Sequence, residues 1–463
     1  MITSLHIRNF KGWKDTGDIK LAPLTVIFGA NSAGKSSLGH LLLTLKQTAQ
    51  SNDNKRPLYL GDDKSMIDLG TYKECLHNHD LSQPLSFNLE WDLPTNLAIQ
   101  NVIDKQVYTG DSLSLAVEFV ADKYEQPKVN TLEYALKKNH DSTLTVKFSY
   151  SETGKPEMDS SPLKLVRNQG RGWPLEDPLK FYRISDQSRA RFQNADFLVD
   201  LALETEKVFS SIQYLGPLRE YPKRTYLWSG DTPENVGQKG ELTIPALLAA
   251  VSKERKLNRS ENKKLYPFDK FIADWLKDLG IIYDFSVKPV AEGRKEYEVL
   301  LKTHAKSSEV KITDVGFGIS QVLPALVQAF YCEPHSTVWM EQPEIHLHPQ
   351  VQAELADVFI SAIKSRENGK ERNVQLIIES HSEHFLNRLQ RRVAEGIVSP
   401  EDVAVYFCKK AGDKTELEPL RLNVFGEIEN WPVNFFGDEM DDISARAFAA
   451  ISRKKDLLKE KSE

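Results

Sequence analysis

The sequence predicts an α/β protein with a mixed or parallel core sheet and an inserted region of mostly antiparallel strands and some helices. Three observations support this fold class. An apolar strand at 24–28 runs through a glycine-containing loop into an apolar helix at 38–45. Short alternating strands separated by turn residues occupy 85–185. Further buried strands follow residue 310, so the core is split between the two ends of the chain.

Length and charge narrow the classes of protein that are possible. The 463 residues allow two or three domains. A net charge of -6 gives no global basic field, so nucleic acid binding would need a local patch. Cys75, Cys332 and Cys408 are too far apart for metal or redox spacing. With no signal-peptide pattern and no apolar run of about 20 residues, we expect a cytoplasmic protein that does not enter a membrane.

Changes in hydrophobic periodicity and in the density of turn residues divide the chain into five predicted segments. Within them, strands are expected at 112–120, 143–150 and 178–185, and helices at 196–209, 242–252 and 267–279. The segments are 1–84, the N-terminal part of the core; 85–212, a β-rich insertion; 213–310, a subdomain of helices and strands; 311–410, the C-terminal part of the core; and 411–463, a tail.

The glycine-containing loop carries the first chemical signal. Gly29 to Ser36 matches the pattern G-x-x-x-x-G-K-[ST], and the flanking strand and helix supply the context that the pattern requires. Its glycines let backbone N–H groups point at phosphate oxygens, Lys35 would reach the β and γ phosphates, and the Ser36 hydroxyl would ligate Mg²⁺. The predicted nucleotide-binding residues here are Asn31, Ser32, Gly34, Lys35, Ser36 and Ser37.

A buried strand at 337–340 ends in the second signal. Glu341 terminates it and is expected to hold Mg²⁺ together with Ser36. The adjacent position, where a second acid is usual, is Gln342, and Glu344 follows two residues later. Either Gln342 or Glu344 would handle the attacking water, and the sequence leaves this choice open.

Two further features complete a candidate catalytic set. The glycines Gly316 and Gly318 lead into Ser320, which either grips a γ-phosphate from outside or only caps a helix. His381 follows the buried strand at 375–378, and a neutral histidine there would hydrogen-bond a γ-phosphate or the attacking water.

The order of these four motifs resembles the ABC-type ATPase heads of the RecF, SMC and OLD superfamily. GANSAGKS resembles their Walker A motif, GFGISQ a degenerate signature motif, and EQPEIHLHP the Walker B motif and D-loop, while His381 takes the place of the switch histidine. The resemblance implies a P-loop ABC-type ATPase head that uses ATP and Mg²⁺. It also implies a homodimer or higher homo-oligomer in which Gly318 and Ser320 act on the nucleotide of another copy.

Smaller likenesses suggest a biological role. EQPEIHLHP, YLGPLR and NWPVNFF resemble a bacterial ATPase group whose wider relatives often serve as ATPase subunits in phage defence. The chain departs from SMC heads in having no long coiled-coil arm, and from OLD nucleases in having no TOPRIM-sized domain after residue 407. The resemblance therefore implies a slow ATPase with a separate effector protein, a nuclease, docked through the tail. The alternatives are a RecF-like repair or end-binding ATPase without an effector, and a nucleotide-sensing scaffold that barely turns ATP over.

Several residues admit rival interpretations. His346, His348 and His384 with His381 are zinc ligands by residue type, but no cysteine or acid cluster completes a set. Arg219 would reach phosphate or form a structural ion pair. The basic segment 253–264 is a solvated loop or a contact for DNA or RNA. The tail contains three aromatic residues that either pack the tail against the core or face a partner protein: Trp431, Phe435 and Phe436.

Overall fold

The computed structural model describes residues 1–170, 173–261, 263–316, 318–412, 414–432, 435, 444–451 and 453. Phe436 and much of the predicted tail lie outside these residues. Among the described helices, none is both long enough and apolar enough to cross a bilayer.

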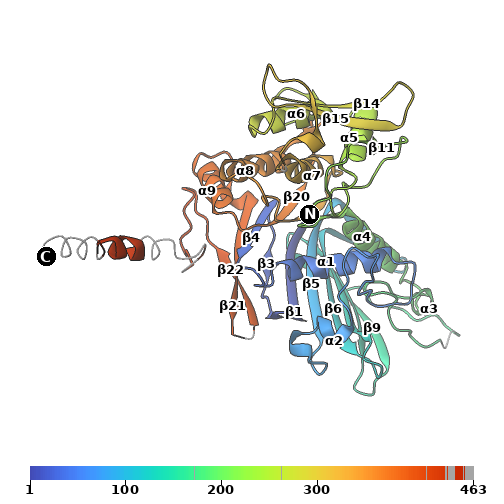
Figure 1. Cartoon of the computed structure of the whole chain (residues 1–463). Coiled ribbons are helices and arrows are strands. Elements are labelled where there is room, and N and C mark those ends of the chain that lie inside the picture. The colour runs from blue at the N-terminus through green and yellow to red at the C-terminus, as the bar shows by residue number, and fades with distance from the viewer. Residues whose placement is uncertain are drawn as a thin grey trace.

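A six-stranded sheet forms the centre of the molecule (Figure 1), as the sequence predicts. Its first five strands are parallel, and the sixth is an antiparallel edge strand. The predicted boundary at 410/411 falls within the hairpin of the last two strands. In spatial order the strands are β10 (Ile212–Leu215), β17 (Thr337–Glu341), β20 (Gln375–Glu379), β4 (Leu24–Gly29), β21 (Val403–Ala411) and β22 (Lys414–Leu420).

Helices cover both faces of this sheet (Figure 1). On one face α7 contacts β17 and α8 contacts β20 and β4, while α5 and α9 pack against these helices and α6 lies farther out. On the other face α1 contacts β4 and β10, and α4 lies beside it. These helices are α1 (Lys35–Gln50), α4 (Phe197–Ser211), α5 (Thr243–Ser252), α6 (Phe268–Asp278), α7 (Gly318–Tyr331), α8 (Pro349–Lys364) and α9 (Glu383–Ala394).

The central sheet separates two hydrophobic cores. Because successive side chains of a strand point to opposite faces, Val26 and Ile378 enter the core under α7 and α8. Their neighbours Ile27 and Ile377 enter the core beneath α1. Both faces of these strands are therefore buried, which explains their nearly continuous apolar runs.

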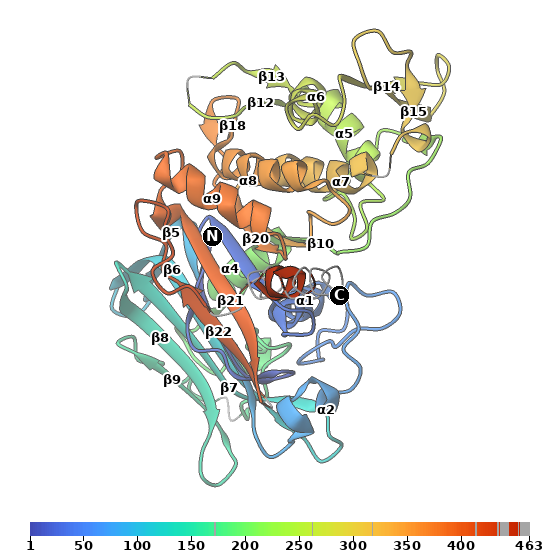
Figure 2. The same ribbon diagram turned by 60° about the vertical axis from the view of Figure 1, so that its left-hand side comes forward.

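The β-rich region forms a second, antiparallel sheet, which contributes to the same core as α1 and is seen edge-on in Figure 2. The N-terminal strand belongs to it, because β1 pairs with β5 across the predicted boundary at 84/85. Its strands are β1 (Ile2–Phe10), β2 (Trp13–Asp15), β3 (Ile19–Lys20), β5 (Leu85–Gln100), β6 (Val107–Ala121), β7 (Pro127–Lys138), β8 (Asp141–Tyr150) and β9 (Pro156–Ser161).

Two local expectations were wrong. The strand predicted at 178–185 is a turn closed by a bridge between Leu179 and Arg183. Its consecutive residues Phe181 and Tyr182 are both buried, which is incompatible with the alternation of a half-exposed strand. The basic segment 253–264 is not a solvated loop throughout, since Lys256–Asn258 forms β12.

The remaining elements are short and lie mainly at the periphery. The small strands form two four-stranded sheets: β11 (Tyr226–Leu227), β14 (Asp284–Pro289), β15 (Glu296–Lys302) and β16 (Val310–Lys311) in one, and β12, β13 (Tyr266–Pro267), β18 (Arg366–Glu367) and β19 (Lys370–Glu371) in the other. The short helices are α2 (Tyr72–Cys75), α3 (Asp186–Arg189), η1 (His77–His79), η2 (Ile312–Asp314) and η3 (Pro400–Asp402).

Candidate nucleotide-binding site

A cleft of about 630 Å³ opens at the edge of the central sheet where its parallel strands end. This edge is where open α/β sheets commonly bind ligands. The structure brings eight of the predicted site residues to the wall of this one cleft. They are Asn31, Ser32, Gly34, Lys35, Ser36, Ser37, Gln342 and His381.

The loop between β4 and α1 has the backbone that phosphate binding requires. Ser32 and Gly34 both have positive φ angles, 60° and 93°. A side chain on Gly29 would place its Cβ 2.4 Å from the carbonyl oxygen of Cys408, so this position accepts only glycine. Lys35 Nζ donates to the carbonyl oxygens of Gly29 and Ala30 at 2.9 and 3.0 Å, which holds the ammonium group inside the loop.

Two carboxylates lie directly behind Ser36. Glu341 and Glu379 end the neighbouring parallel strands β17 and β20 and are paired in register. Ser36 Oγ donates to Glu379 Oε2 at 2.8 Å, Trp339 Nε1 donates to Glu379 Oε1 at 2.9 Å, and the Tyr214 hydroxyl donates to Glu341 Oε1 at 2.8 Å. Burial raises the pKa of both acids, and the neighbouring charge of Glu341 contributes to raising that of Glu379 to about 8.

Sequence reasoning missed Glu379. The signal was present, because Glu379 ends a buried strand in the same way as Glu341 does. Nothing local distinguished it, since its contact with Ser36 joins residues 343 positions apart.

Gln342 and Glu344 occupy different environments. Gln342 lines the cleft in a left-handed conformation, φ 46°, and its N–H donates to the carbonyl oxygen of Glu379 at 2.9 Å. Such conformations are costly for residues other than glycine and cluster at functional sites. Glu344 is buried instead, and its Oε1 accepts hydrogen bonds from Ser380 Oγ and the His381 N–H at 2.8 and 2.7 Å. Glu344 thus holds the loop that carries His381 through these two hydrogen bonds, and it is not among the residues that line the cleft in the described part of the chain.

His381 has the properties expected of a neutral phosphate-facing group. Its Nε2 is buried and has no hydrogen-bond partner among the described residues. Burial lowers the pKa of His381, and the charge of Lys35 lowers it further. The imidazole is therefore neutral near pH 7, and the residue lines the cleft.

The serine of the GFGISQ motif lies elsewhere. Gly318 and Ser320 begin α7, and Ser320 is buried. An added Cβ on Gly318 would lie 3.7 Å from Leu347 Cδ2, which places the motif beside the loop that follows β17. The described lining of the cleft includes neither residue, so a single chain does not bring this motif to its own Lys35.

The same residues match a known family. The family model described as "AAA ATPase domain" matches residues 1–169 and 239–386, a span that includes the eight predicted residues of the cleft wall and the acids Glu341, Glu344 and Glu379. The chain belongs to this family. A second model, described as "Protein of unknown function (DUF3696)", matches residues 398–445.

Other comparisons are more distant. No curated protein matches this AAA ATPase domain protein. A solved Smc head bound to the C-winged helix domain of ScpA is 11% identical, with 91% of this chain and 98% of that chain covered and a TM-score of 0.41. An SMC head domain from Thermotoga maritima is 10% identical, with 91% and 99% covered and a TM-score of 0.39. Because both scores are below 0.5, the fold class rests on the sheet topology and the family match.

Arg219 of the ATPase domain protein takes a structural position. Its side chain is only 8% exposed, and Nη2 donates to the carbonyl oxygen of Glu341 at 3.4 Å. Burial lowers the pKa of Arg219 to about 10. The described lining of the cleft does not include Arg219, and this hydrogen bond joins it to the end of β17.

The histidines considered as zinc ligands do not form a cluster. His348 instead caps α8, because its Nδ1 accepts a hydrogen bond from the Gln350 N–H at 3.3 Å. Within the described part of the chain, no group of three or more His, Cys, Asp or Glu side chains is arranged to hold a metal ion.

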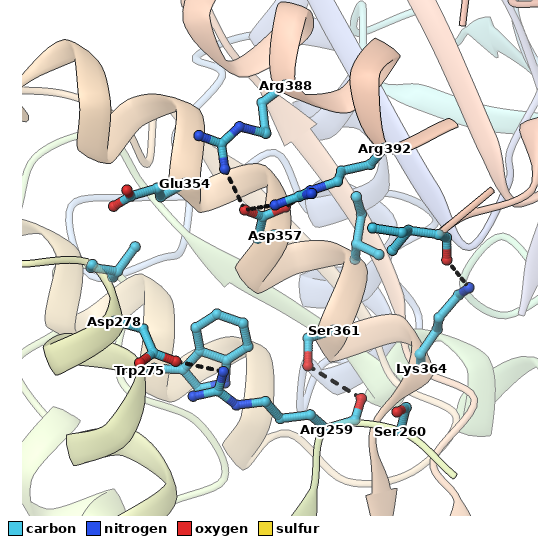
Figure 3. Close-up of a pocket in the computed structure, with 13 residues that line it drawn as sticks. Arg259, Ser260, Trp275, Asp278, Glu354, Asp357, Ser361, Lys364, Arg388 and Arg392 are labelled. Atoms are coloured by element: carbon cyan, nitrogen blue, oxygen red, sulfur yellow. Dashed lines mark hydrogen bonds and ion pairs between the residues drawn. The ribbon is translucent and has the colours of Figure 1, made fainter. Parts of the chain in front are cut away.

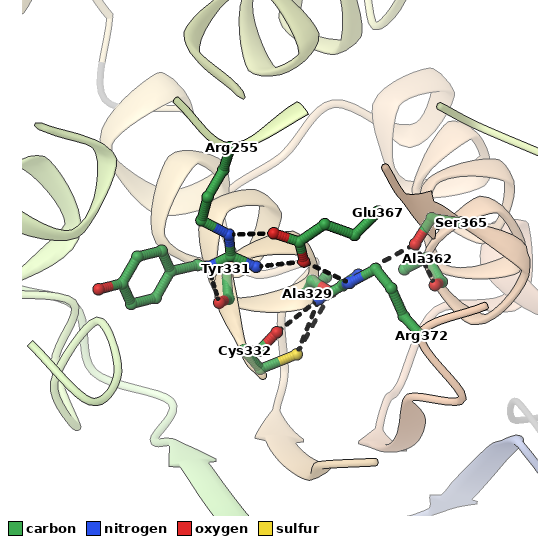
Figure 4. A network of polar contacts seen from close by, with 8 residues as sticks. All are labelled: Arg255, Ala329, Tyr331, Cys332, Ala362, Ser365, Glu367 and Arg372. Carbon is green, nitrogen blue, oxygen red and sulfur yellow. Dashed lines mark hydrogen bonds and ion pairs between the residues drawn. The ribbon is translucent and has the colours of Figure 1, made fainter. Parts of the chain in front are cut away.

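Two arginines of the basic segment are engaged in internal contacts. Arg255 is buried, and its Nε donates to Glu367 at 2.6 Å within a network that also includes Tyr331 and Arg372 (Figure 4). Arg259 lies in a second cavity of about 550 Å³, 2.6 Å from Asp278 (Figure 3). The Arg255 side chain therefore joins the subdomain to the end of α7, whereas the Arg259 side chain pairs with α6 inside the subdomain.

Two aromatic residues of the tail, Phe435 and Trp431, differ in how far they are buried. Phe435 packs with its ring centroid 5.6 Å from that of Phe28 and 4.7 Å from that of Phe407, as expected for a residue that joins the tail to the core. Trp431 contacts Phe435 but remains about half exposed.

Proposed function

We propose that this protein is an ABC-type ATPase that binds Mg·ATP in the cleft and hydrolyses it slowly. One observation carries the proposal: Lys35, Ser36, Gln342 and His381 meet in one cleft, with Glu341 directly behind Ser36. Their chemistry fits the ligand, because phosphates need a cation and inward-pointing N–H groups, and Mg²⁺ needs hard oxygen atoms.

Each residue has a distinct role in this proposal. Lys35 and the N-terminus of α1 bind the negatively charged phosphates. Ser36 and Glu341 would hold Mg²⁺, which supplies neutralising charge to the phosphate oxygens when it is bound. Neutral His381 contacts the terminal phosphate or the attacking water, and Gln342 orients that water. Glu344 positions His381 through the hydrogen bond to its backbone N–H.

The active unit of this proposal is a dimer or a higher oligomer. Gly318 and Ser320 lie outside the described lining of their own cleft, yet they begin a helix whose N-terminus is suited to an anion. A second copy would present these residues to the γ-phosphate, so that ATP joins the two heads.

We further propose that ATP-dependent dimerisation controls a separate effector, a nuclease in antiviral defence. The sequence resemblance supports this role, and the residues after β22 offer an apolar surface for docking, with Val424, Phe425 and Trp431 exposed by 63%, 73% and 47%. A role in nucleic acid repair without an effector is less favoured, because Arg255 and Arg259 are engaged in ion pairs. Purification of the native complex tests the effector, and recovery of this chain alone would contradict it.

The nucleotide proposal is tested by replacing Lys35 with alanine. We expect ATP binding measured by calorimetry to be lost, because the charge facing the phosphates is removed, while the circular dichroism spectrum stays unchanged. Lys55, an exposed lysine on the loop after α1, provides the matched control, and Lys55→Ala should bind ATP as the wild type does. Equal affinity of Lys35→Ala and wild type would contradict the proposed function.

A further inference from the structure

We propose that Glu379 is a second carboxylate ligand of the Mg²⁺ site, acting together with Glu341 and the Ser36 hydroxyl. This inference rests on the proposed function, since the ion would arrive with the nucleotide. It adds to that site an acid from a different strand, β20, to which the sequence analysis gave no role.

The sheet register brings the two acids together. Glu341 and Glu379 are paired residues at the ends of parallel strands, so both carboxylates leave the sheet at the same edge. Ser36 connects them to the cleft, because it lines the cleft while its hydroxyl donates to Glu379 Oε2 at 2.8 Å. With its proton directed at Glu379, the Ser36 oxygen keeps lone pairs for a metal ion.

Neutral donors orient the two carboxylates. Trp339 Nε1 holds Glu379 Oε1 at 2.9 Å, and the Tyr214 hydroxyl holds Glu341 Oε1 at 2.8 Å. Hydrogen bonds of this type fix the orientation of metal-binding side chains and are a regular part of metal sites.

The two buried carboxyl groups have no direct ion-pair partner. Glu379 is 1% exposed and Glu341 is 5% exposed, and among the described residues neither has a cationic side chain within 4 Å. Arg219 and Lys35 act on the pair only from farther away, and the Lys35 ammonium group is bonded to the carbonyls of Gly29 and Ala30. Buried charges in proteins are normally paired or bound to a metal, so the arrangement fits a divalent cation.

The composition of the site also fits Mg²⁺ rather than zinc. Mg²⁺ is usually held by one or two carboxylates, with substrate phosphates and water completing its coordination. Because Gln342 stands where a second acid is usual after β17, Glu379 supplies a second carboxyl group from the neighbouring strand, which would lose its proton when the cation binds. A simpler alternative is that Glu379 only orients Ser36 and never touches the ion.

The experiment uses Mn²⁺ as the probe, detected by electron paramagnetic resonance on the full chain with a non-hydrolysable ATP analogue. We expect Glu379→Gln to weaken Mn²⁺ binding by about tenfold or more while binding of the analogue in EDTA stays at the wild-type level. The matched control is Glu383→Gln, which removes an exposed acid four residues away and should have no effect. Mn²⁺ binding by Glu379→Gln within twofold of wild type would overturn the inference.

A cysteine variant separates direct ligation from orientation of Ser36. A thiolate ligand favours soft metals, so Glu379→Cys should shift the preference of the site from Mn²⁺ towards Cd²⁺, whereas Glu383→Cys should not. An unchanged Cd²⁺ to Mn²⁺ preference in Glu379→Cys would also overturn direct ligation. The two proposals stay distinct, because failure of wild type to bind the analogue in the presence of Mg²⁺ contradicts the proposed function, whereas the Glu379 variants test only the inference.

Discussion

Gln342 determines how water would be activated at this site. A glutamine amide cannot take a proton near neutral pH, but it can orient water, as a glutamine does in Ras-type GTPases. We therefore predict that Gln342→Glu hydrolyses ATP faster than wild type in single-turnover assays. General-base catalysis contributes about 10²–10⁴-fold, so even a partial gain is measurable.

Two further variants identify the residue that handles the water. Gln342→Ala should be slower than wild type, and Glu344→Gln should retain hydrolysis, because Glu344 lies behind the His381 loop. If Gln342→Ala matches wild type and Glu344→Gln is inactive, Glu344 is the base instead.

His40 makes the stability of the protein sensitive to mild acid. Burial lowers the pKa of His40 to about 4, from an ordinary value of 6.5, and its Nδ1 has no partner among the described residues. As the pH falls below 6.5, His40 becomes protonated in the unfolded chain, whereas in the folded protein it stays neutral until about pH 4. The free energy of unfolding therefore decreases across this pH window. The loss from this group is about 2 kcal/mol at pH 5.

The variant His40→Gln isolates this effect. Urea denaturation at pH 7.5 and pH 5.0 should show a smaller loss of stability in the variant than in wild type. An identical loss in both proteins would show that His40 does not titrate as the structure implies.

At the scale of elements, α1 and β17 are fitted to each other through a glycine. A Cβ on Gly39 would lie 2.4 Å from Cε2 of the Trp339 ring, so the ring packs directly against the backbone of α1. Alanine in a helix normally stabilises by about 1 kcal/mol over glycine. Here we predict that Gly39→Ala destabilises instead, by about 1–3 kcal/mol, because the neighbours must shift.

A double-mutant cycle checks the cause of this change. In a Trp339→Phe background, which shortens the ring, the cost of Gly39→Ala measured by urea denaturation should shrink. An equal cost in both backgrounds would assign the effect to the helix rather than to the contact.

Sequence reasoning succeeded where the signal is local. The strand, loop and helix around Lys35 were predictable because hydrophobic periodicity and glycine spacing are read within about 25 residues. Glu379 and the buried pair of Arg255 with Glu367 were not, because they depend on contacts between distant segments. The turn at 178–185 was misread because β-rich composition alone does not establish alternation.

At the scale of the whole molecule, the site we propose is shared between two copies. Lys35→Ala and Ser320→Arg should each inactivate the homo-oligomer, while their mixture regains one intact composite site per mixed dimer. With random pairing at equal amounts, we expect about a quarter of wild-type ATPase activity. A mixture that forms mixed oligomers but stays inactive would contradict the assignment of Ser320 to the opposite copy.

The position of β4 in the sheet also determines when the protein can be completed during synthesis. β4 consists of residues 24–29, yet its two neighbours β20 and β21 come from residues 375–379 and 403–411. The strand that precedes the phosphate loop is therefore synthesised long before the two strands with which it pairs. Until then its apolar edges are unpaired, which favours association with chaperones or with other nascent chains. Chains that stall before β20 would therefore expose an unpaired apolar strand, and the nucleotide cleft would form only after β20 and β21 have been translated.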